Sequence, residues 1–261
     1  MINIDELNPG RVIIAGDWHR NLFAAWPKIV IRLAQELEIS TIVHVGDFGY
    51  KYGSIDAYNF EKPLHKALLD AHINLIWIDG NHDNHEMRLR LSTGVDNFIQ
   101  TGARGNIYYA PRGLRWQWAG KTFGALGGAF SPNWRKLVEG KTLFKELEEV
   151  TWNDLEKLGK APLDYLITHD VPERVILSSP LGIMQKTETR VILQEAVDTT
   201  KPLRVFSGHW HRRVDFRIPR ADGQTSFGHI LDKEWTKGNV LILDLITDEI
   251  IPLPLSWIQH K

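Results

Sequence analysis

The chain has 261 residues, of which 43% are hydrophobic and 24% charged, so it can bury a large core and is not a disordered chain. A formal net charge of −1 and a pI near 6.8 exclude the strongly basic surface that sequence-independent nucleic-acid binding requires. The absence of cysteine excludes disulfides and thiolate metal ligands.

The start of the chain, MINIDELNPG, lacks a basic region followed by an apolar stretch, as a secretory leader would have. No apolar run reaches the roughly 18 residues that a membrane-spanning helix needs. We therefore expect a soluble, cytoplasmic protein that does not associate with membranes.

Short β-rich runs alternate with helical stretches along the chain, which predicts a mixed α/β sheet. Between the first two runs, a helix is expected to begin near Pro27 and to bury Ile29, Leu33 and Leu37 on one face, as a crossover between parallel strands. The predicted strands are RVIIAG (11–16), TIVHVG (41–46), INLIWID (73–79), LDYLIT (163–168) and LRVFS (203–207).

The second half of the chain contains three predicted antiparallel hairpins. They lie at 114–128 around a Gly-Lys turn, at 214–230 around an Asp-Gly turn and at 239–255 around Thr247 to Glu249. A parallel half joined to a hairpin-rich half predicts an α/β fold of two mixed sheets flanked by helices, a four-layer αββα sandwich. We expect one domain over residues 1–261.

Residues 131–160 form a charged stretch that we interpret as a helical insertion in this sandwich. Thr151 and Asp154 have the spacing of a helix-starting capping box. Because charge-rich helices are usually solvated faces, a pair of surface helices is favoured over a lid across a site.

Polar motifs follow five of the predicted strands: GDWH (16–19), GDFG (46–49), GNHD (80–83), THD (168–170) and GHWH (208–211). In open α/β sheets, ligands bind outside the carboxyl ends of the strands, so these motifs are expected to converge. Their oxygen and nitrogen atoms suit divalent Mn, Fe, Zn, Co or Ni. Seven residues are too many for one ion but suit two ions that share a carboxylate. They are Asp17, His19, Asp47, Asn81, His169, His209 and His211.

The ordered set GDxH, GDxx, GNHD, a later lone His and GHxH resembles the calcineurin-like metallophosphoesterase superfamily, over residues 17 to 211. The segment LGGAFSPNWRK further resembles small bacterial and phage members. The resemblance implies the αββα fold and a hydrolase. It also implies two divalent metal ions, for which we expect manganese, with Fe, Zn, Co or Ni as alternatives.

The resemblance also implies a role for each matched residue. His82 would be a non-ligand histidine that contacts the substrate phosphate and assists the leaving group, whereas Asp83 receives no role. The metal groups would be Asp17, His19 and His211 for one ion, Asn81, His169 and His209 for the other, and Asp47 as the bridge between them.

Three further residues are candidates for substrate binding: Arg20, Trp134 and Arg135. Arg20 is equally compatible with a solvent-exposed position, and a packing role is favoured for Trp134 in a chain with ten tryptophans. His44 is interpreted as a hydrogen-bonded structural histidine outside the site.

Two cations bridged by Asp47 would lower the pKa of a shared water, whose hydroxide would attack phosphorus in line. His82 would serve the leaving oxygen. Tyr50 and Lys51 stand where the protein-phosphatase branch carries Asp and Arg, which favours phosphodiesters over monoesters as substrates. A nuclease or cyclic-nucleotide phosphodiesterase and a non-catalytic metal-binding scaffold remain open. Nucleic acid is expected only as a substrate, and the oligomeric state is undetermined.

Overall fold

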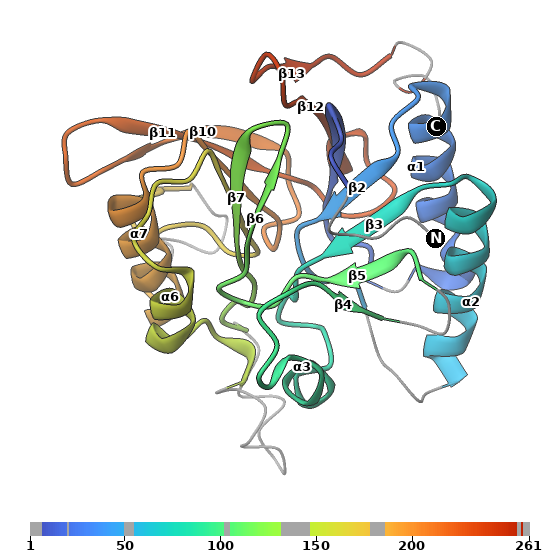
Figure 1. Ribbon diagram of the computed structural model, residues 1–261, viewed down its shortest axis with the longest axis horizontal. Coiled ribbons are helices and arrows are strands. Elements are labelled where there is room, and N and C mark those ends of the chain that lie inside the picture. Colours follow the sequence, from blue (N-terminus) through green and yellow to red (C-terminus); the bar gives the residue numbers. More distant parts are fainter. Residues whose placement is uncertain are drawn as a thin grey trace.

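Two β-sheets pack face to face at the centre of the protein, with helices on both outer faces (Figure 1). The computed structural model describes residues 7–19, 21–49, 55–101, 105–131, 147–177, 186–254 and 257. Within these ranges the predicted strands, the crossover helix and all three hairpins are present.

The first sheet has the strand order β13-β12-β1-β2-β3-β5-β4. β1, β2, β3 and β5 are parallel, while β12 pairs antiparallel with β1. The loops that follow β1, β2 and β3 therefore emerge at the same edge. The bounds are β1 (Arg11–Ala15), β2 (Thr41–His44), β3 (Asn74–Trp77), β4 (Ile99–Gln100), β5 (Ile107–Tyr109), β12 (Val240–Asp244) and β13 (Ile250–Ile251).

The second sheet has the order β10-β11-β9-β8-β7-β6, in which β7, β8, β9 and β11 are parallel. The β6–β7 hairpin turns at Ala119 and Gly120, one residue earlier than the predicted Gly-Lys turn, because both of these residues have the positive φ of a tight hairpin turn. The bounds are β6 (Arg115–Trp118), β7 (Lys121–Leu126), β8 (Tyr165–Thr168), β9 (Arg204–Ser207), β10 (Val214–Pro219) and β11 (Thr225–Ile230).

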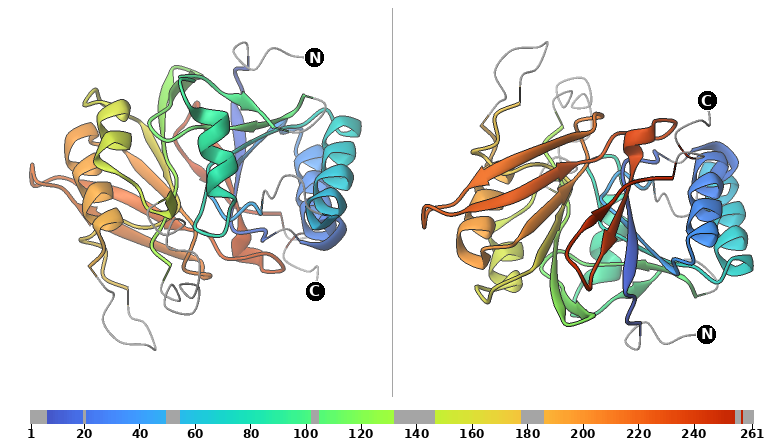
Figure 2. Two further views of the ribbon diagram at one scale, coloured as in Figure 1. Left: turned by 90° about the horizontal axis from the view of Figure 1, so that it is seen from below. Right: turned by 90° about the horizontal axis from the view of Figure 1, so that it is seen from above.

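Helices complete the four layers, as Figure 2 shows from two sides. α1 (Ala25–Glu36) and α2 (Ile55–Asp70) cover the first sheet, and α6 (Trp152–Leu158) and α7 (Glu188–Thr200) cover the second. The αββα prediction is confirmed. The shorter elements are α3 (His85–Ser92), η2 (Leu22–Ala24) and η3 (Lys237–Asn239).

The central strands are buried on both faces, which explains their continuous apolar runs. In β1, Ile13 packs in the core beneath α1 and α2, whereas Ile14 packs in the core between the two sheets. A third core lies between the second sheet and α7, where Leu166 contacts residues such as Leu193. Three apolar cores thus fix the strands that carry the polar loops.

The start and buried face of α1 differ from the prediction. The helix begins at Ala25 rather than at Pro27, and Ile29 and Leu37 are only partly buried, although Leu33 is buried as expected. The indole Nε1 of Trp26 donates to Asn239 Oδ1 at 2.7 Å, and the buried face of the helix includes Trp26.

The predicted capping box is confirmed at the start of α6. Thr151 Oγ1 accepts the Asp154 backbone N–H at 3.2 Å, and Asp154 Oδ2 accepts the Thr151 N–H at 3.0 Å. Residues 132–146, with Trp134 and Arg135, lie outside the described residues, so the lid question and the single-domain organisation stay predictions. No helix among the described residues is long and apolar enough to cross a bilayer.

Candidate metal centre

The loops after β1, β2, β3, β8 and β9 converge at the carboxyl ends of the strands. β1 leads to Asp17 and His19, and β2 leads to Asp47. The structure brings all seven predicted ligand residues into two adjoining groups. The other four are Asn81 after β3, His169 after β8, and His209 and His211 after β9.

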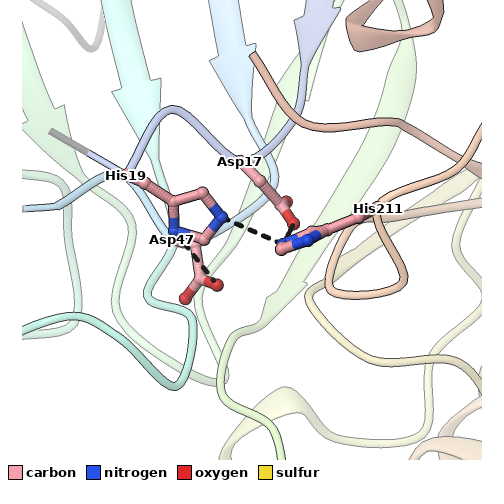
Figure 3. Close-up of side chains that lie close together, drawn as sticks. All are labelled: Asp17, His19, Asp47 and His211. Atoms are coloured by element: carbon pink, nitrogen blue, oxygen red, sulfur yellow. Dashed lines mark hydrogen bonds and ion pairs between the residues drawn. The ribbon is translucent and has the colours of Figure 1, made fainter. Parts of the chain in front are cut away.

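The first group consists of Asp17, His19, Asp47 and His211, whose potential ligand atoms all lie within 4.8 Å of one another (Figure 3). Asp17 Oδ2 is 3.2 Å from His211 Nε2, and His19 Nδ1 is 3.8 Å from Asp47 Oδ2. The Nε2 atoms of His19 and His211 face each other at 3.0 Å. Several lone pairs therefore point at one small volume.

The second group is centred on the Asn81 side-chain oxygen. This atom lies 3.2 Å from His169 Nε2 and 3.0 Å from His209 Nδ1. His169 Nε2 is also 3.3 Å from Asp47 Oδ2, the same oxygen that faces His19 in the first group. Asp47 thus stands between the two groups, with one oxygen near a histidine of each.

The chemistry of these residues fits divalent cations. Asp17 Oδ1 is buried and has no hydrogen-bond partner among the described residues, and no lysine or arginine pairs with Asp17 or Asp47 in this part of the chain. A buried carboxylate oxygen without a partner is costly, and a metal ion would supply its positive partner. The oxygen and imidazole ligands suit Mn, Fe, Zn, Co or Ni.

Four of the candidate ligands have a left-handed backbone: His19, Asp47, His209 and His211, with φ between 45° and 66°. Each such conformation costs a non-glycine residue about 1–3 kcal/mol, and strain of this kind clusters at functional sites. Bonds between the loops hold it, because the His19 N–H donates to the Asp47 carbonyl at 2.9 Å and the His209 N–H donates to Asp17 Oδ2 at 3.0 Å.

The stretch DGNHDN after β3 has a structural explanation at almost every position. A Cβ on Gly80 would overlap Asp47 and the His169 ring, so only glycine allows these loops to approach. Asn84 caps α3, since its Oδ1 accepts the Met87 N–H at 3.1 Å.

His82 lies beside the first group without joining it. Its side chain is exposed, and its ring centroid is 5.5 Å from that of His19 in an edge-on arrangement. Its backbone N–H donates to Asp47 Oδ1 at 2.8 Å. The backbone is therefore fixed to the shared carboxylate while the imidazole faces solvent.

Two hydrogen bonds orient the ligands of the second group. His169 Nδ1 lies 2.8 Å from the Val45 carbonyl, so it carries the proton and leaves Nε2 for a metal ion. Asn81 Nδ2 donates to Ser131 Oγ at 3.0 Å, which turns the amide oxygen toward the histidines. Sequence reasoning missed Ser131, although it is the serine of the GGA-S segment.

Asp47 and His169 form a buried ion pair in the metal-free chain. Burial opposes the charge on both groups, but His169 holds the pKa of Asp47 below its usual range, and Asp47 raises the pKa of His169 to about 10. Burial lowers the pKa of His19 and of His209, which favours the neutral form that binds metals. A cation bound at His169 Nε2 would therefore displace a proton.

A second buried cluster, the Asp79 network, was also missed by sequence reasoning. Asp79 Oδ2 lies 2.5 Å from Arg112 Nη2 and 3.0 Å from Nε, and Oδ1 accepts the Tyr109 hydroxyl at 2.8 Å. Arg88 Nε is 3.5 Å away. Although burial alone would raise the pKa of Asp79, the two arginines hold it below its usual range.

The Asp79 network supports the second metal group. Its fifth member, His85, is buried, with Nδ1 3.8 Å from Asp79 Oδ2 and Nε2 3.2 Å from the Asn81 carbonyl. Arg112 also donates to the carbonyls of Leu147 and Glu148 at 3.1 and 2.9 Å, at the return from residues 132–146. In the sequence, the acidic residue directly before GNHD, Asp79, was the signal that could have revealed this network.

The structure contradicts one part of the prediction for His44. It lies outside the metal groups, but the expected hydrogen bond is absent, because neither ring nitrogen has a partner among the described residues. The ring instead packs edge-on against Trp18 at 4.6 Å, and burial lowers its pKa to about 3. The substrate-binding candidates Arg20, Trp134 and Arg135, and the Tyr50–Lys51 pair, lie outside the described residues.

Comparisons with known proteins agree with this arrangement. The sequence profile of the family described as calcineurin-like phosphoesterase matches residues 10–213. One crystal structure aligns with TM-score 0.56 and 14% identity over 93% of this chain and 98% of its own. The protein TT1561 of Thermus thermophilus aligns with TM-score 0.54 and 13% identity over 94% and 98%. GAP50, the anchor in the inner membrane complex of Plasmodium, aligns with TM-score 0.50 and 12% identity over 94% and 88%. No curated protein sequence matches.

Proposed function

This chain belongs to the calcineurin-like phosphoesterase family, and we propose that it is a metal-dependent hydrolase that prefers phosphodiesters. Members of the family typically bind two divalent metal ions. The observation that carries the proposal is the place of Asp47, whose Oδ2 lies 3.8 Å from His19 Nδ1 and 3.3 Å from His169 Nε2. One carboxylate oxygen can thus serve both groups.

In this proposal, Asp47 is shared by two metal ions. When bound, the ions would supply hydroxide near neutral pH and positive charge for the phosphoryl oxygens. The chain contributes neutral imidazoles at His19 and His209, and a fixed amide oxygen at Asn81. The first ion would be held by Asp17, His19 and His211, and the second by Asn81, His169 and His209.

His82 is proposed to serve the substrate rather than a metal ion. Its imidazole is exposed beside His19, and its backbone N–H is fixed to Asp47. A group in that place can contact a phosphate oxygen or donate a proton to the departing oxygen.

A His82→Ala variant tests this role. It should retain two ions per chain while turnover falls by roughly 10²–10⁴ on esters with alkoxide leaving groups, which need a proton. The loss should be small for p-nitrophenolate, which leaves as a stable anion. Equal losses on both substrates would instead assign phosphate binding to His82, and the loss of an ion would make it a ligand.

The preference for diesters rests on the sequence GDFGYKYGS, which lacks the Asp-Arg pair of the monoester-cleaving protein phosphatases. We expect faster hydrolysis of bis(p-nitrophenyl) phosphate than of p-nitrophenyl phosphate. EDTA should abolish both activities, and Mn²⁺ should restore them. A monoester-only profile would reverse the substrate assignment, and full activity after removal of the metals would refute the metal requirement.

A further inference from the structure

Asp83 joins the two loops that carry the shared carboxylate and the second metal group. It is the last residue of GNHD, its side chain is buried with 7% exposed, and neither the sequence motif nor the proposed chemistry gives it a role.

Both carboxylate oxygens of Asp83 accept backbone hydrogen bonds. Oδ1 accepts the Gly49 N–H at 2.6 Å, and Oδ2 accepts the N–H groups of Gly80 at 2.8 Å and Phe48 at 3.3 Å. Two of these donors come from the loop after β2 and one from the loop after β3. A single carboxylate therefore ties two loops together.

The donors lie within two residues of proposed ligands. Phe48 and Gly49 follow Asp47, and Gly80 precedes Asn81. The tie also runs in the opposite direction, because the backbone N–H of His82, in Asp83's own loop, donates to Asp47 Oδ1 at 2.8 Å. The separation between Asp47 and Asn81 is thus fixed by bonds from both sides.

We infer that Asp83 is a positioning residue that sets the distance between Asp47 and Asn81, and through it the affinity of the second metal group. The inference rests on the proposed function, since it assumes metal ions in these groups. The first ion should depend on Asp83 much less, because it shares Asp47 but its other three residues, Asp17, His19 and His211, lie on other loops.

The Asp83→Asn variant should disrupt this geometry, because an amide has only one acceptor oxygen. If that oxygen faces Gly49, the amide NH₂ faces the N–H groups of Gly80 and Phe48. In the other orientation, the NH₂ faces Gly49. Either way, at least one backbone N–H loses its acceptor and faces a second donor, which weakens the connection between the two loops.

The test is titration of metal-free Asp83→Asn with Mn²⁺, followed by calorimetry and by the EPR signal of spin-coupled Mn²⁺ pairs. The affinity for the second Mn²⁺ should fall about 10–100-fold, as for other residues that orient metal ligands, while that for the first changes less than about threefold. Excess Mn²⁺ should restore the coupled signal and most of the turnover.

The matched control is Asp244→Asn. Asp244 Oδ1 likewise accepts two backbone N–H groups, from Ile246 and Thr247 at 2.9 and 3.0 Å, but in the β12–β13 turn. The Asp244→Asn variant should bind both ions with the affinities of the wild type. If Asp83→Asn does not fold, Asp83→Glu, which keeps two acceptor oxygens, should show the same selective weakening in smaller degree.

The possible outcomes separate this inference from the proposed function. Equal weakening of both Mn²⁺ sites, or unchanged affinity for the second, would overturn the role of Asp83 while leaving a two-metal protein. A wild-type protein that binds fewer than two Mn²⁺ ions would refute the proposed function instead.

Discussion

Asp79 and Asn81 stand two residues apart after β3, but they belong to buried polar clusters of opposite character. In the Asp79 network, each carboxylate oxygen of the central acid meets a partner from the same chain, Arg112 at 2.5 Å and Tyr109 at 2.8 Å. In the metal centre, Asp17 Oδ1 lacks a partner among the described residues, and the Nε2 atoms of His19 and His211 face each other.

This difference indicates that the Asp79 network is a structural scaffold, whereas the metal centre is a binding site. A buried carboxylate is tolerated when a guanidinium and a hydroxyl satisfy it, so the Asp79 network can form on folding without help. The metal centre brings acceptor atoms together on strained backbone, at a free-energy cost that a bound cation would offset. The His85–Asn81 contact of 3.2 Å shows that the scaffold supports the site.

The largest expected effect follows from Asp47→Asn. An amide bridges two cations poorly, so turnover should fall by more than about 10³-fold, beyond the loss typical of one catalytic hydrogen-bond donor. The metal-free chain should also lose some stability at pH 7, because the neutral amide removes the charge that pairs with buried His169, although His169 can respond by losing its proton. Near-normal turnover would remove Asp47 from the bridge, and a loss of stability larger than that of Asp79→Asn would break the contrast between the clusters.

The Asp79→Asn substitution is expected to reduce mainly the folding stability. Arg112 would remain buried with only Asp154, 3.6 Å away, as a carboxylate partner, so the free energy of unfolding should fall by about 3–5 kcal/mol. Denaturant unfolding of the metal-free chain at pH 7 measures this. The control Asp70→Asn, which breaks a pair with Lys66 whose acid is 64% exposed, should cost less than about 1 kcal/mol.

The pH dependence of the Asp79 effect has a definite sign. The folded pKa of Asp79 lies below its usual value, so the pair contributes fully above about pH 4 and its contribution is lost as the pH falls through the folded pKa. The stability difference between the wild type and Asp79→Asn should therefore shrink in acid. A difference that stays constant down to pH 2 would contradict the charge argument.

Ser131→Ala should have an intermediate effect. Without Ser131 Oγ, the Asn81 amide loses the acceptor that orients it, and metal affinity should fall about 10–100-fold. In an Asn81→Asp background, both side-chain atoms are oxygens and orientation no longer matters, so adding Ser131→Ala should cost little. A similar loss in both backgrounds would show that Ser131 acts by packing alone.

At pH 7 the smallest effect is expected at His44, whose contribution changes only as the pH falls. Because its folded pKa is about 3 against 6.5 in the unfolded chain, its stability contribution is intact above pH 6.5 and is lost as the pH falls toward 3. In this interval the wild type should lose about 1.4 kcal/mol per pH unit more than His44→Leu. Parallel stability curves between pH 7 and 5 would show that His44 is protonated in the folded chain.

The sequence alone predicted the αββα sandwich and the convergence of the seven candidate ligands. Both follow from local signals, because doubly buried strands are continuous apolar runs and parallel strands present their carboxyl ends at one edge. The capping box of α6 is equally local, since Thr151 and Asp154 are three residues apart. A motif next to a strand end is therefore visible before any tertiary contact is known.

Only the tertiary structure decided what surrounds those ligands. Ser131 meets Asn81 across 50 residues, Arg112 meets Asp79 across 33, and Asn239 receives the Trp26 indole across 213. The left-handed backbone of His209 likewise depends on the Asp17 carboxylate. These contacts leave no periodic pattern in the sequence. The hydrogen bonds of a buried cluster depend instead on where the packed sheets place the donors and acceptors.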